Sequence, residues 1–339
     1  MTPGDWQCLA QRFELGYLTG DPGYVTRGAM GEIWRLDTSN GRWAVKWQFP
    51  WAPADPRPLD ATVQLAAAAA GVPLPLPVTA PDADAVAAVG GRHARVYHWV
   101  ELGQPVLLPA TPAVAADAGR LLGLLHRLGL TSDEPVDPWY TQVRPADYWT
   151  ELADRATAAG AAWAPRLAGA RGLVAYLSEF VTPPPDRPVI VCHRDFNPGN
   201  VIPAVPDGRL TVLDWENCGP LDPVRELGYA VYTWSCGGGR FDAGAAEALL
   251  AGYASATGAD PELPDDLFAT AVATHVNVLG VMAEQAIAEP EHRRYAEARI
   301  AELLDDELAE LRQLLALWPA AIGRPAPEGA QVHTIKERQ

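Results

Sequence analysis

Residues 191–202 read VCHRDFNPGNVI, and this stretch places a carboxylate and an amide five residues apart, at Asp195 and Asn200. Pro198 and Gly199 lie between them and favour a tight turn. We therefore expect the loop to fold back and bring Asp195 and Asn200 toward one reacting group. A carboxylate can accept a proton and an amide oxygen can bind a metal ion. The stretch predicts a loop that carries a general base and a metal ligand.

The order His-Arg-Asp, followed five residues after the Asp by an Asn, is the catalytic-loop pattern of kinases. Asp214 follows Asn200 by fourteen residues, at the end of the β-like run 210–213. Its carboxylate suits Mg²⁺, a cation that prefers oxygen ligands and would also hold the β- and γ-phosphates of a nucleotide. The two motifs together predict phosphoryl transfer.

Lysine is rare in this chain, since only Lys46 and Lys336 stand among 26 basic residues. Lys46 ends the strand-like run 43–46, where kinases place the lysine that grips the α- and β-phosphates. Gly28 and Gly31 begin and end the turn GAMG, whose backbone amides could cover a triphosphate. Each signal is weak alone, but all of them occur in the order that kinase chemistry requires.

The chain begins with β-like segments and continues with helical ones. A hairpin signal at 38–41 lies within a β meander over 23–49, and a helix at 60–70 and a strand at 94–100 follow. Helical periodicity then predicts these helices: 113–128, 148–159, 167–180, 226–234, 243–254, 267–288 and 291–317. Two β-like runs, 189–191 and 210–213, interrupt them. This order predicts an α+β fold with a small β-rich lobe and a larger, mainly helical lobe.

Composition narrows the class of protein. At 339 residues with 48% hydrophobic residues, the chain can form two lobes with separate cores. It has no long apolar run and no signal-peptide pattern, so we expect a cytoplasmic protein. The net charge of -16 disfavours nucleic acid and anionic membranes as partners and favours a cationic one. The four cysteines lack metal-ligand spacing and are expected to be reduced.

Three motifs together resemble the aminoglycoside phosphotransferase family, which also includes choline, homoserine, fructosamine and macrolide kinases. They are His193-x-Asp195-x4-Asn200, the triplet Asp214-Trp215-Glu216, and GPLDPVREL at 219–227. The resemblance covers about residues 23–317. It implies a two-lobe protein-kinase-like fold and an ATP-dependent kinase of small molecules that uses Mg²⁺. Protein kinases fit less well, because Trp215 replaces their Phe and no Ala-Pro-Glu motif follows.

The resemblance also implies roles for individual residues. Asp195 is the catalytic base, and His193 supports its loop. Asn200 and Asp214 hold Mg²⁺, while Lys46 holds phosphate.

A hinge at 99–103, with Trp99 and Val100, would contact adenine. It divides an N-terminal nucleotide-binding lobe, 1–98, from a C-terminal catalytic lobe, 104–321, and a loose tail follows at 322–339. In the family an acidic residue pairs with the strand lysine. The helix before Gly71 offers only Asp60 and Gln64 for this role, so the partner of Lys46 stays open.

The acceptor is the least defined part of the site. Glu216, Asp222, Asn277 and Glu284 are candidates to bind it, and they would suit a hydroxylated, cationic molecule such as an aminoglycoside. Two alternatives remain: a kinase of a metabolic sugar, amino alcohol or nucleoside, and an inactive nucleotide-binding regulator. The sequence does not decide the oligomeric state.

Overall fold

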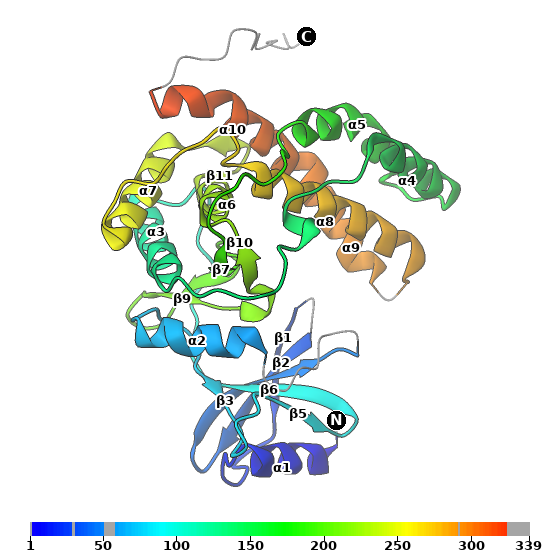
Figure 1. Cartoon of the computed structure of the whole chain (residues 1–339). Coiled ribbons are helices and arrows are strands. Elements are labelled where there is room, and N and C mark those ends of the chain that lie inside the picture. Colours follow the sequence, from blue (N-terminus) through cyan, green and yellow to red (C-terminus); the bar gives the residue numbers. More distant parts are fainter. Residues whose placement is uncertain (1, 29–30, 51–57, 291, 324–339) are drawn as a thin grey trace. The chain divides into compact units, whose positions relative to one another are not determined.

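The computed structural model describes residues 2–28, 31–50, 58–290 and 292–323. The chain forms two compact units, each assembled from several segments of the sequence. Unit 1 comprises 1–106, 121–134 and 190–220, and unit 2 comprises 107–120, 135–189 and 221–339. Unit 1 contains an antiparallel sheet and unit 2 is mainly helical, so the predicted α+β class is confirmed (Figure 1).

An antiparallel sheet forms the centre of unit 1, with the strand order β1-β2-β3-β6-β4 and β5 also paired to β6. The strands are β1 (Gly23–Arg27), β2 (Gly31–Thr38), β3 (Gly41–Gln48), β4 (Pro77–Val78), β5 (Val86–Val89) and β6 (Arg92–His98). The predicted meander and its turn at 38–41 are confirmed. Side chains alternate across a strand, so neighbours on β3 face opposite sides of the sheet.

One face of the sheet packs on helix α1 (Pro3–Arg12), which the sequence prediction missed (Figure 1). The ring of Trp6 lies 5.3 Å from that of Trp47 and 5.5 Å from that of Trp34. Val45 and Trp47 are fully buried in this core. The apolar face of α1 therefore closes the side of the sheet away from the site.

Lys46 points to the opposite face, because it lies between Val45 and Trp47 on β3. Helix α2 (Leu59–Ala69) lies on this side and contacts the short helix η2 (Trp215–Asn217). The predicted helix at 60–70 is confirmed. This second face carries the candidate active site.

The segment 190–220 belongs to unit 1 together with the sheet. It contains β7 (Ile190–Cys192), the hairpin β8 (Val201–Pro203) and β9 (Leu210–Val212), and β10 (Gly219–Leu221), which pairs with β7. The amide of Gly103 donates to the carbonyl of Pro203 (2.7 Å), and that of Val212 donates to the carbonyl of Pro73 (2.9 Å). These backbone bonds fasten the predicted catalytic segment to the N-terminal part of the chain. The lobes expected at 1–98 and 104–321 follow sequence order and remain a prediction.

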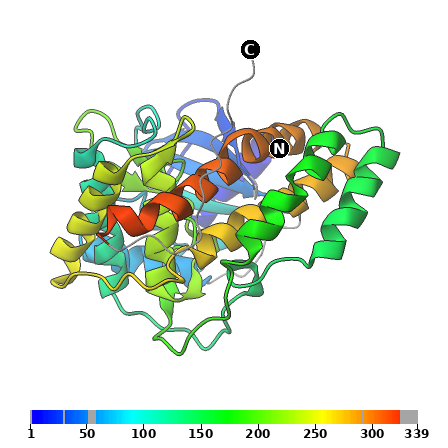
Figure 2. The ribbon, with the colours of Figure 1, turned by 90° about the horizontal axis from the view of Figure 1, so that it is seen from above.

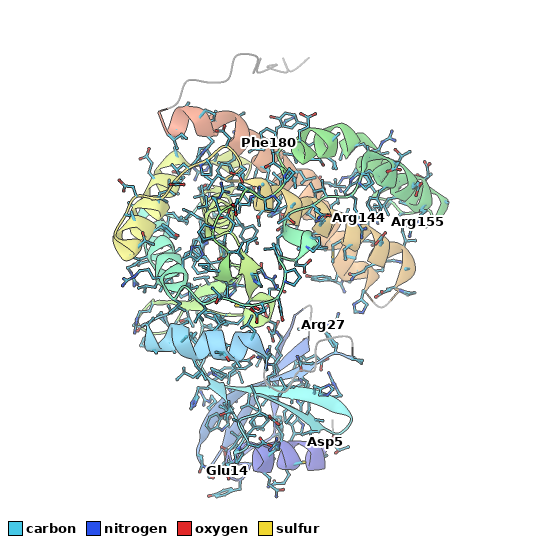
Figure 3. All side chains as sticks on the ribbon, in the orientation of Figure 1. Asp5, Glu14, Arg27, Arg144, Arg155 and Phe180 are labelled. Carbon is cyan, nitrogen blue, oxygen red and sulfur yellow. The ribbon has the colours of Figure 1, made fainter. Side chains whose placement is uncertain are left out.

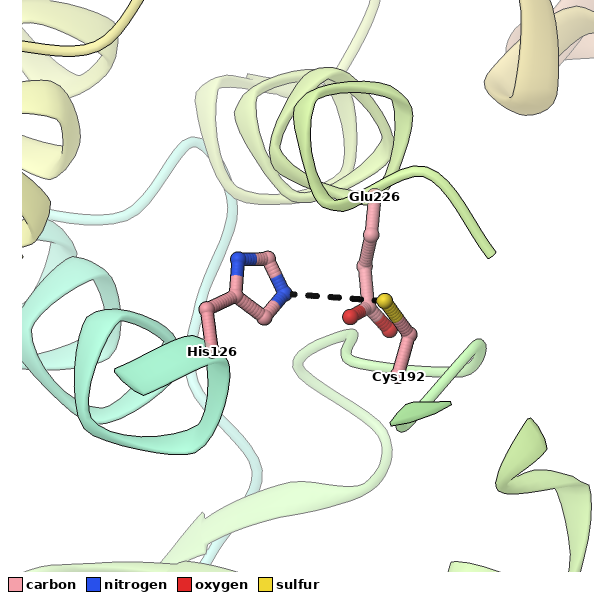
Figure 4. Close-up of side chains that lie close together, drawn as sticks. All are labelled: His126, Cys192 and Glu226. Carbon is pink, nitrogen blue, oxygen red and sulfur yellow. Dashed lines mark hydrogen bonds between the residues drawn. The ribbon is translucent and has the colours of Figure 1, made fainter. Parts of the chain in front are cut away.

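Helix α3 (Pro112–Arg127) contributes its last turns to unit 1. There His126 Nε2 lies 4.0 Å from the Sγ of Cys192, and both side chains are buried (Figure 4). None of the four cysteines forms a disulfide bond, and three of them are buried. Burial raises the pKa of the Cys236 thiol to about 12, so this thiol is neutral.

Unit 2 is built from helices that the sequence periodicity largely predicts. In addition to the start of α3, its elements are η1 (Pro138–Tyr140), α4 (Ala146–Ala158), α5 (Ala164–Ser178), α6 (Pro223–Ser235), β11 (Cys236–Gly237), β12 (Arg240–Phe241), α7 (Ala243–Thr257), α8 (Ala269–Ala288), α9 (Arg293–Glu302), η3 (Leu303–Glu307) and α10 (Leu308–Ala321). The helices α4 and α5 pack on each other and on α8 (Figure 2). The single helix predicted at 291–317 is interrupted by the π-helical turn η3. Residues 291 and 324–339 lie outside the described part. Among the described residues, no helix combines the length and apolarity that a membrane span requires.

An ion-pair cluster fixes the loop before α8 within unit 2. Arg187 forms two parallel hydrogen bonds to the carboxylate of Asp266, at 3.0 and 2.7 Å, and the fully buried Arg225 adds a third at 2.9 Å. Burial raises the pKa of the Asp266 carboxyl, but the bonds from Arg187 and Arg225 outweigh it and leave that pKa below its ordinary value. The ionised carboxylate therefore stabilises the folded unit.

Replacing Asp266 by Asn should lower the free energy of unfolding at pH 7 by about 3 kcal/mol, because Arg225 loses a buried anionic partner. A depressed carboxyl pKa stabilises the fold above the unfolded-state value of about 3.9, and this contribution disappears as pH falls through the folded-state value. The difference in the free energy of unfolding between the wild type and Asp266→Asn should therefore become smaller at acidic pH. Urea unfolding from pH 7 to pH 3 measures it, with the exposed Asp260→Asn as control. A constant difference would contradict this account.

Candidate active site

The carboxylate of Asp195 is held by neighbouring amides. Asn197 Nδ2 donates to Oδ1 at 2.6 Å, and Asn200 Nδ2 donates to Oδ2 at 2.8 Å. Asn217 of η2 donates to Oδ2 from 3.4 Å. Asn197 also accepts a bond from the amide of Gly199 (2.8 Å), which forms the turn that the sequence predicts. Asp195 and Asn200 therefore meet as expected.

Two backbone positions beside the catalytic groups adopt left-handed conformations. Arg194 has φ 63° and Asp214 has φ 55°, which costs roughly 1–2 kcal/mol for a residue with a Cβ. The side chain of Arg194 bonds to the carbonyls of Asn217 and Cys218, so side-chain bonds from this residue hold the loop in place. Strain that local bonds maintain is typical of functional loops.

His193 connects the catalytic loop to the segment that carries Asp214. Its Nε2 lies 3.0 Å from the carbonyl oxygen of Leu213, and its ring packs against Trp215 at 4.9 Å. The side chain is 2% exposed and lies away from solvent. This position is consistent with support of the loop rather than with proton transfer, and the supporting role stays a prediction.

Lys46 lies between two carboxylates on the buried face of the sheet. Its Nζ is 2.9 Å from Oδ1 of Asp214 and 2.7 Å from Oε1 of Glu216. The lysine and Glu216 are buried, with side chains 8% and 12% exposed, whereas the side chain of Asp214 is 41% exposed. The structure places Glu216, which the sequence predicts as an acceptor residue, beside Lys46; its role toward an acceptor stays a prediction.

Arg95 adds a second cation to this face. It lies directly opposite Lys46 in the β3–β6 register, and two like charges at such positions repel each other. Arg95 pairs with Asp60 of α2 at 2.5 Å, and it lies 3.4 Å from Oε1 of Glu216. Asp60, which the sequence offered as a partner of Lys46 and a nucleotide-site residue, is thus paired with Arg95.

The pKa values follow from burial and pairing. Burial disfavours the charge on Lys46, but Glu216 and Asp214 outweigh it and raise its pKa. Burial likewise opposes ionisation of Asp214, yet bonds from Glu216 and Lys46 lower the pKa of this carboxyl. For Glu216 burial dominates and its pKa is raised. At neutral pH the lysine is therefore charged and Asp214 is ionised.

The glycine turn and the hinge lie in the same unit. Gly28 donates from its amide to the carbonyl of Gly31 at 2.9 Å, while the intervening residues 29–30 lie outside the described part. A Cβ on Gly31 would lie 2.4 Å from the carbonyl oxygen of Trp47, so a side chain cannot be accommodated there. At the hinge, Trp99 donates from its indole to Glu101 (2.9 Å), and Trp99 and Val100 are partly buried. Contact of the hinge with adenine stays a prediction.

The other predicted acceptor residues lie in unit 2. Asp222 accepts a bond from the amide of Val224 at the start of α6 and pairs with Arg187 at 2.6 Å. Asn277 donates to two backbone carbonyls, both at 2.8 Å. These two side chains stabilise the helical unit.

Glu284 is the more accessible candidate. It lies 3.7 Å from Arg155 of α4, which is labelled in Figure 3, and its side chain is 38% exposed. The role of Asp222, Asn277 and Glu284 toward an acceptor stays a prediction.

Asn200 and Asp214 carry oxygen donors that could hold Mg²⁺. Asn200 uses its Nδ2 for Asp195, which leaves its carbonyl oxygen as the atom for a metal ion. Asp214 presents an ionised, partly exposed carboxylate. Oxygen donors of these types suit a hard divalent cation.

Three residues of this site were not predicted: Arg95, Asn197 and Asn217. Arg95 could have been suspected from its place in a strand beside the one that carries Lys46, but only the pairing register shows that the two are opposite. Asn197 and Asn217 carry no spacing signal, since their role depends on where the loop turns.

Comparison with known proteins agrees with this geometry. Residues 25–264 match the model of the phosphotransferase enzyme family. This chain belongs to that family. Membership confirms the predicted family and the prediction of an ATP-dependent small-molecule kinase. No curated protein sequence matches this phosphotransferase.

Solved structures with the same fold are distant in sequence. A spectinomycin phosphotransferase in complex with ADP and spectinomycin has a TM-score of 0.64 and 13% identity, covering 89% of this chain and 97% of its own. An aminoglycoside phosphotransferase from Alicyclobacillus acidocaldarius has a TM-score of 0.58 and 18% identity, covering 92% and 96%. A microcompartment-associated aminopropanol kinase has a TM-score of 0.55 and 17% identity, covering 94% and 99%. At these identities the likeness confirms the protein-kinase-like fold and does not identify the acceptor.

The position of Lys46 predicts its effect on nucleotide binding. Lys46→Met should weaken Mg·ATP binding about tenfold or more, a loss of roughly 1.4 kcal/mol or more, because the phosphates lose their buried cation. Isothermal titration calorimetry measures the dissociation constant. Lys336→Met, which changes the only other lysine of the chain, is the matched control and should bind as the wild type does. Equal affinity of both variants would remove Lys46 from the nucleotide site.

Proposed function

We propose that this phosphotransferase moves the γ-phosphoryl group of ATP to a hydroxyl of a small cationic molecule, with an aminoglycoside-type antibiotic as the first candidate. The observation that carries this proposal is the meeting of Asp195 and Asn200 in one unit with the Lys46–Asp214 pair. A base, a metal ligand and a phosphate-binding cation are the parts that phosphoryl transfer requires.

Asp195 acts as the base. Its two oxygens accept bonds from Asn197 and Asn200, which fix the carboxylate plane before the acceptor arrives. Such preorganisation means that the reacting hydroxyl meets a group that need not reorient. Asp195 accepts the hydroxyl proton as the oxygen bonds to phosphorus and the bond from phosphorus to the ADP oxygen breaks.

Mg²⁺ held by Asn200 and Asp214 would neutralise charge on the β- and γ-phosphates. Lys46 supplies a fixed positive charge for the phosphates from the sheet. The hydrogen bond between Asn200 and Asp195 joins the metal ligand directly to the base, so the two groups are positioned together.

Two observations support a cationic acceptor. The chain carries a net charge of -16, which attracts cations electrostatically. A spectinomycin phosphotransferase and an aminoglycoside phosphotransferase are among the solved structures with this fold. A metabolic amino alcohol is the second candidate, because an aminopropanol kinase has the same fold. An inactive nucleotide-binding regulator is disfavoured, since Lys46, Asp195, Asn200 and Asp214 are all present.

The acceptor class can be tested in cells and with purified protein. The chain is expressed in an antibiotic-sensitive bacterium, and growth inhibition is measured for a panel of aminoglycosides and other cationic antibiotics. Protection should appear for at least one compound, and the same compound should accept labelled phosphate from ATP in vitro. Transfer to amino alcohols or sugars without protection would assign the metabolic alternative. No transfer to any acceptor would favour the regulator.

The base is tested with Asp195→Asn. The rate constant kcat should fall by about two to four orders of magnitude, because the acceptor proton has no receiver. The dissociation constant of Mg·ATP should stay close to that of the wild type. Asp207→Asn, an exposed aspartate in the loop between β8 and β9, is the matched control and should retain full activity. An active Asp195→Asn enzyme would contradict the assignment.

A further inference from the structure

Helix α2 faces Lys46, but its one carboxylate is not available to pair with the lysine. Asp60 is the only acidic residue of α2. Its Oδ2 lies 2.5 Å from Arg95 and accepts a 3.2 Å bond from Gln64. The buried side chain of Asp60 is therefore paired with Arg95. Lys46 must pair with a carboxyl group from another element.

Glu216 supplies a carboxyl partner for Lys46 from the segment that carries Asp214. Its Oε1 lies 2.7 Å from Lys46 and 3.4 Å from Arg95, so one oxygen bridges the two cations that face each other across β3 and β6. Without Glu216, Lys46 and Arg95 would be adjacent like charges with Asp60 as the nearest buried anion. The bridge makes their close approach possible.

Exposure separates the roles of the two carboxylates beside Lys46. The side chain of Asp214 is 41% exposed and can turn toward a metal ion, whereas that of Glu216 is 12% exposed and lies beside Lys46, Arg95 and Asp214. If Asp214 engages a metal, Lys46 still has Glu216. If Glu216 engaged the metal instead, both Lys46 and Arg95 would lose their shared partner.

We propose that Glu216 is a positioning residue that holds Lys46 for the phosphates, with Arg95 and Asp60 as its anchor. This inference rests on the proposed function. The segment 214–216 then positions both the metal ligand Asp214 and the side chain of Lys46. A movement of this segment would therefore move the two together. Glu216 contacts neither the acceptor nor the metal ion.

The test compares Glu216→Gln with Glu32→Gln, which changes a glutamate of β2 in the same sheet that pairs with Arg92 at 3.6 Å. For Glu216→Gln we expect a Kd for Mg·ATP raised about tenfold and a kcat lowered about tenfold or more. The KM of the acceptor found in the panel and the half-saturating Mg²⁺ concentration should stay within about threefold of wild type. Glu32→Gln should change none of these. Glu216→Asp, which keeps the charge on a shorter arm, should recover part of the Mg·ATP affinity.

Each other outcome overturns the proposal. A raised acceptor KM with unchanged Mg·ATP affinity would make Glu216 an acceptor residue, and a raised Mg²⁺ requirement would make it a metal ligand. Unchanged constants would show that Lys46 needs no such anchor.

If Glu216→Gln does not fold, Arg95→Lys serves as the second variant, because it keeps the charge but loses the fork that reaches both carboxylates. It should also weaken Mg·ATP binding, and wild-type affinity would refute the anchor. If the wild type phosphorylates no acceptor, the proposed function fails, while the Mg·ATP affinities still decide this inference.

Discussion

The burial of Lys46 is the constraint on which the site depends. An ammonium group loses most of its hydration when it is 8% exposed, and it stays charged only where anions replace the lost water. Asp214 and Glu216 do so, and the need to keep them within reach fixes the segment after β9 against the sheet. The hydrogen bond from Asn217 to Asp195 and the edge contact between the rings of His193 and Trp215 then follow from the position of that segment.

The same constraint explains the arrangement of charges around the lysine. Arg95 stands opposite Lys46, and such a pair of cations is tolerable only with carboxylates on both sides. Asp60 and Glu216 provide them, at 2.5 and 3.4 Å from Arg95. Asp214, the more exposed carboxylate, is the one that can exchange the lysine for a metal ion. A cluster of this kind fixes the positions of its side chains more than it raises the free energy of unfolding, because buried ion pairs contribute little net free energy.

Unit 1 also shows why residues distant in sequence share one site. The segment 190–220 is joined to the N-terminal part by backbone bonds from Gly103 to Pro203 and from Val212 to Pro73. On the other face of the sheet, Trp6 and Trp47 form the core that makes the strands rigid. The candidate site is thus supported by one packed face of the sheet and by a hairpin that is hydrogen-bonded to Pro73, before β4, and to Gly103, after β6.

The sequence by itself determined the fold class and the family, and it predicted that Asp195 and Asn200 meet. Asp195 and Asn200 are close because a five-residue loop with Pro198 and Gly199 must turn, which is a local constraint that spacing reveals. The partners of Lys46 were decided by the tertiary structure. Asp60 was one of the two partners that the sequence offered for Lys46. The strand register places Arg95 opposite the lysine, and Asp60 pairs with Arg95. Glu216, 170 residues after the lysine, then contacts both cations. Helix α1 was missed for a related reason. Its place in the fold depends on the packing of Trp6 on Trp47, which is distant in the sequence. Contacts between residues far apart in sequence depend on register and packing, and no local pattern encodes them.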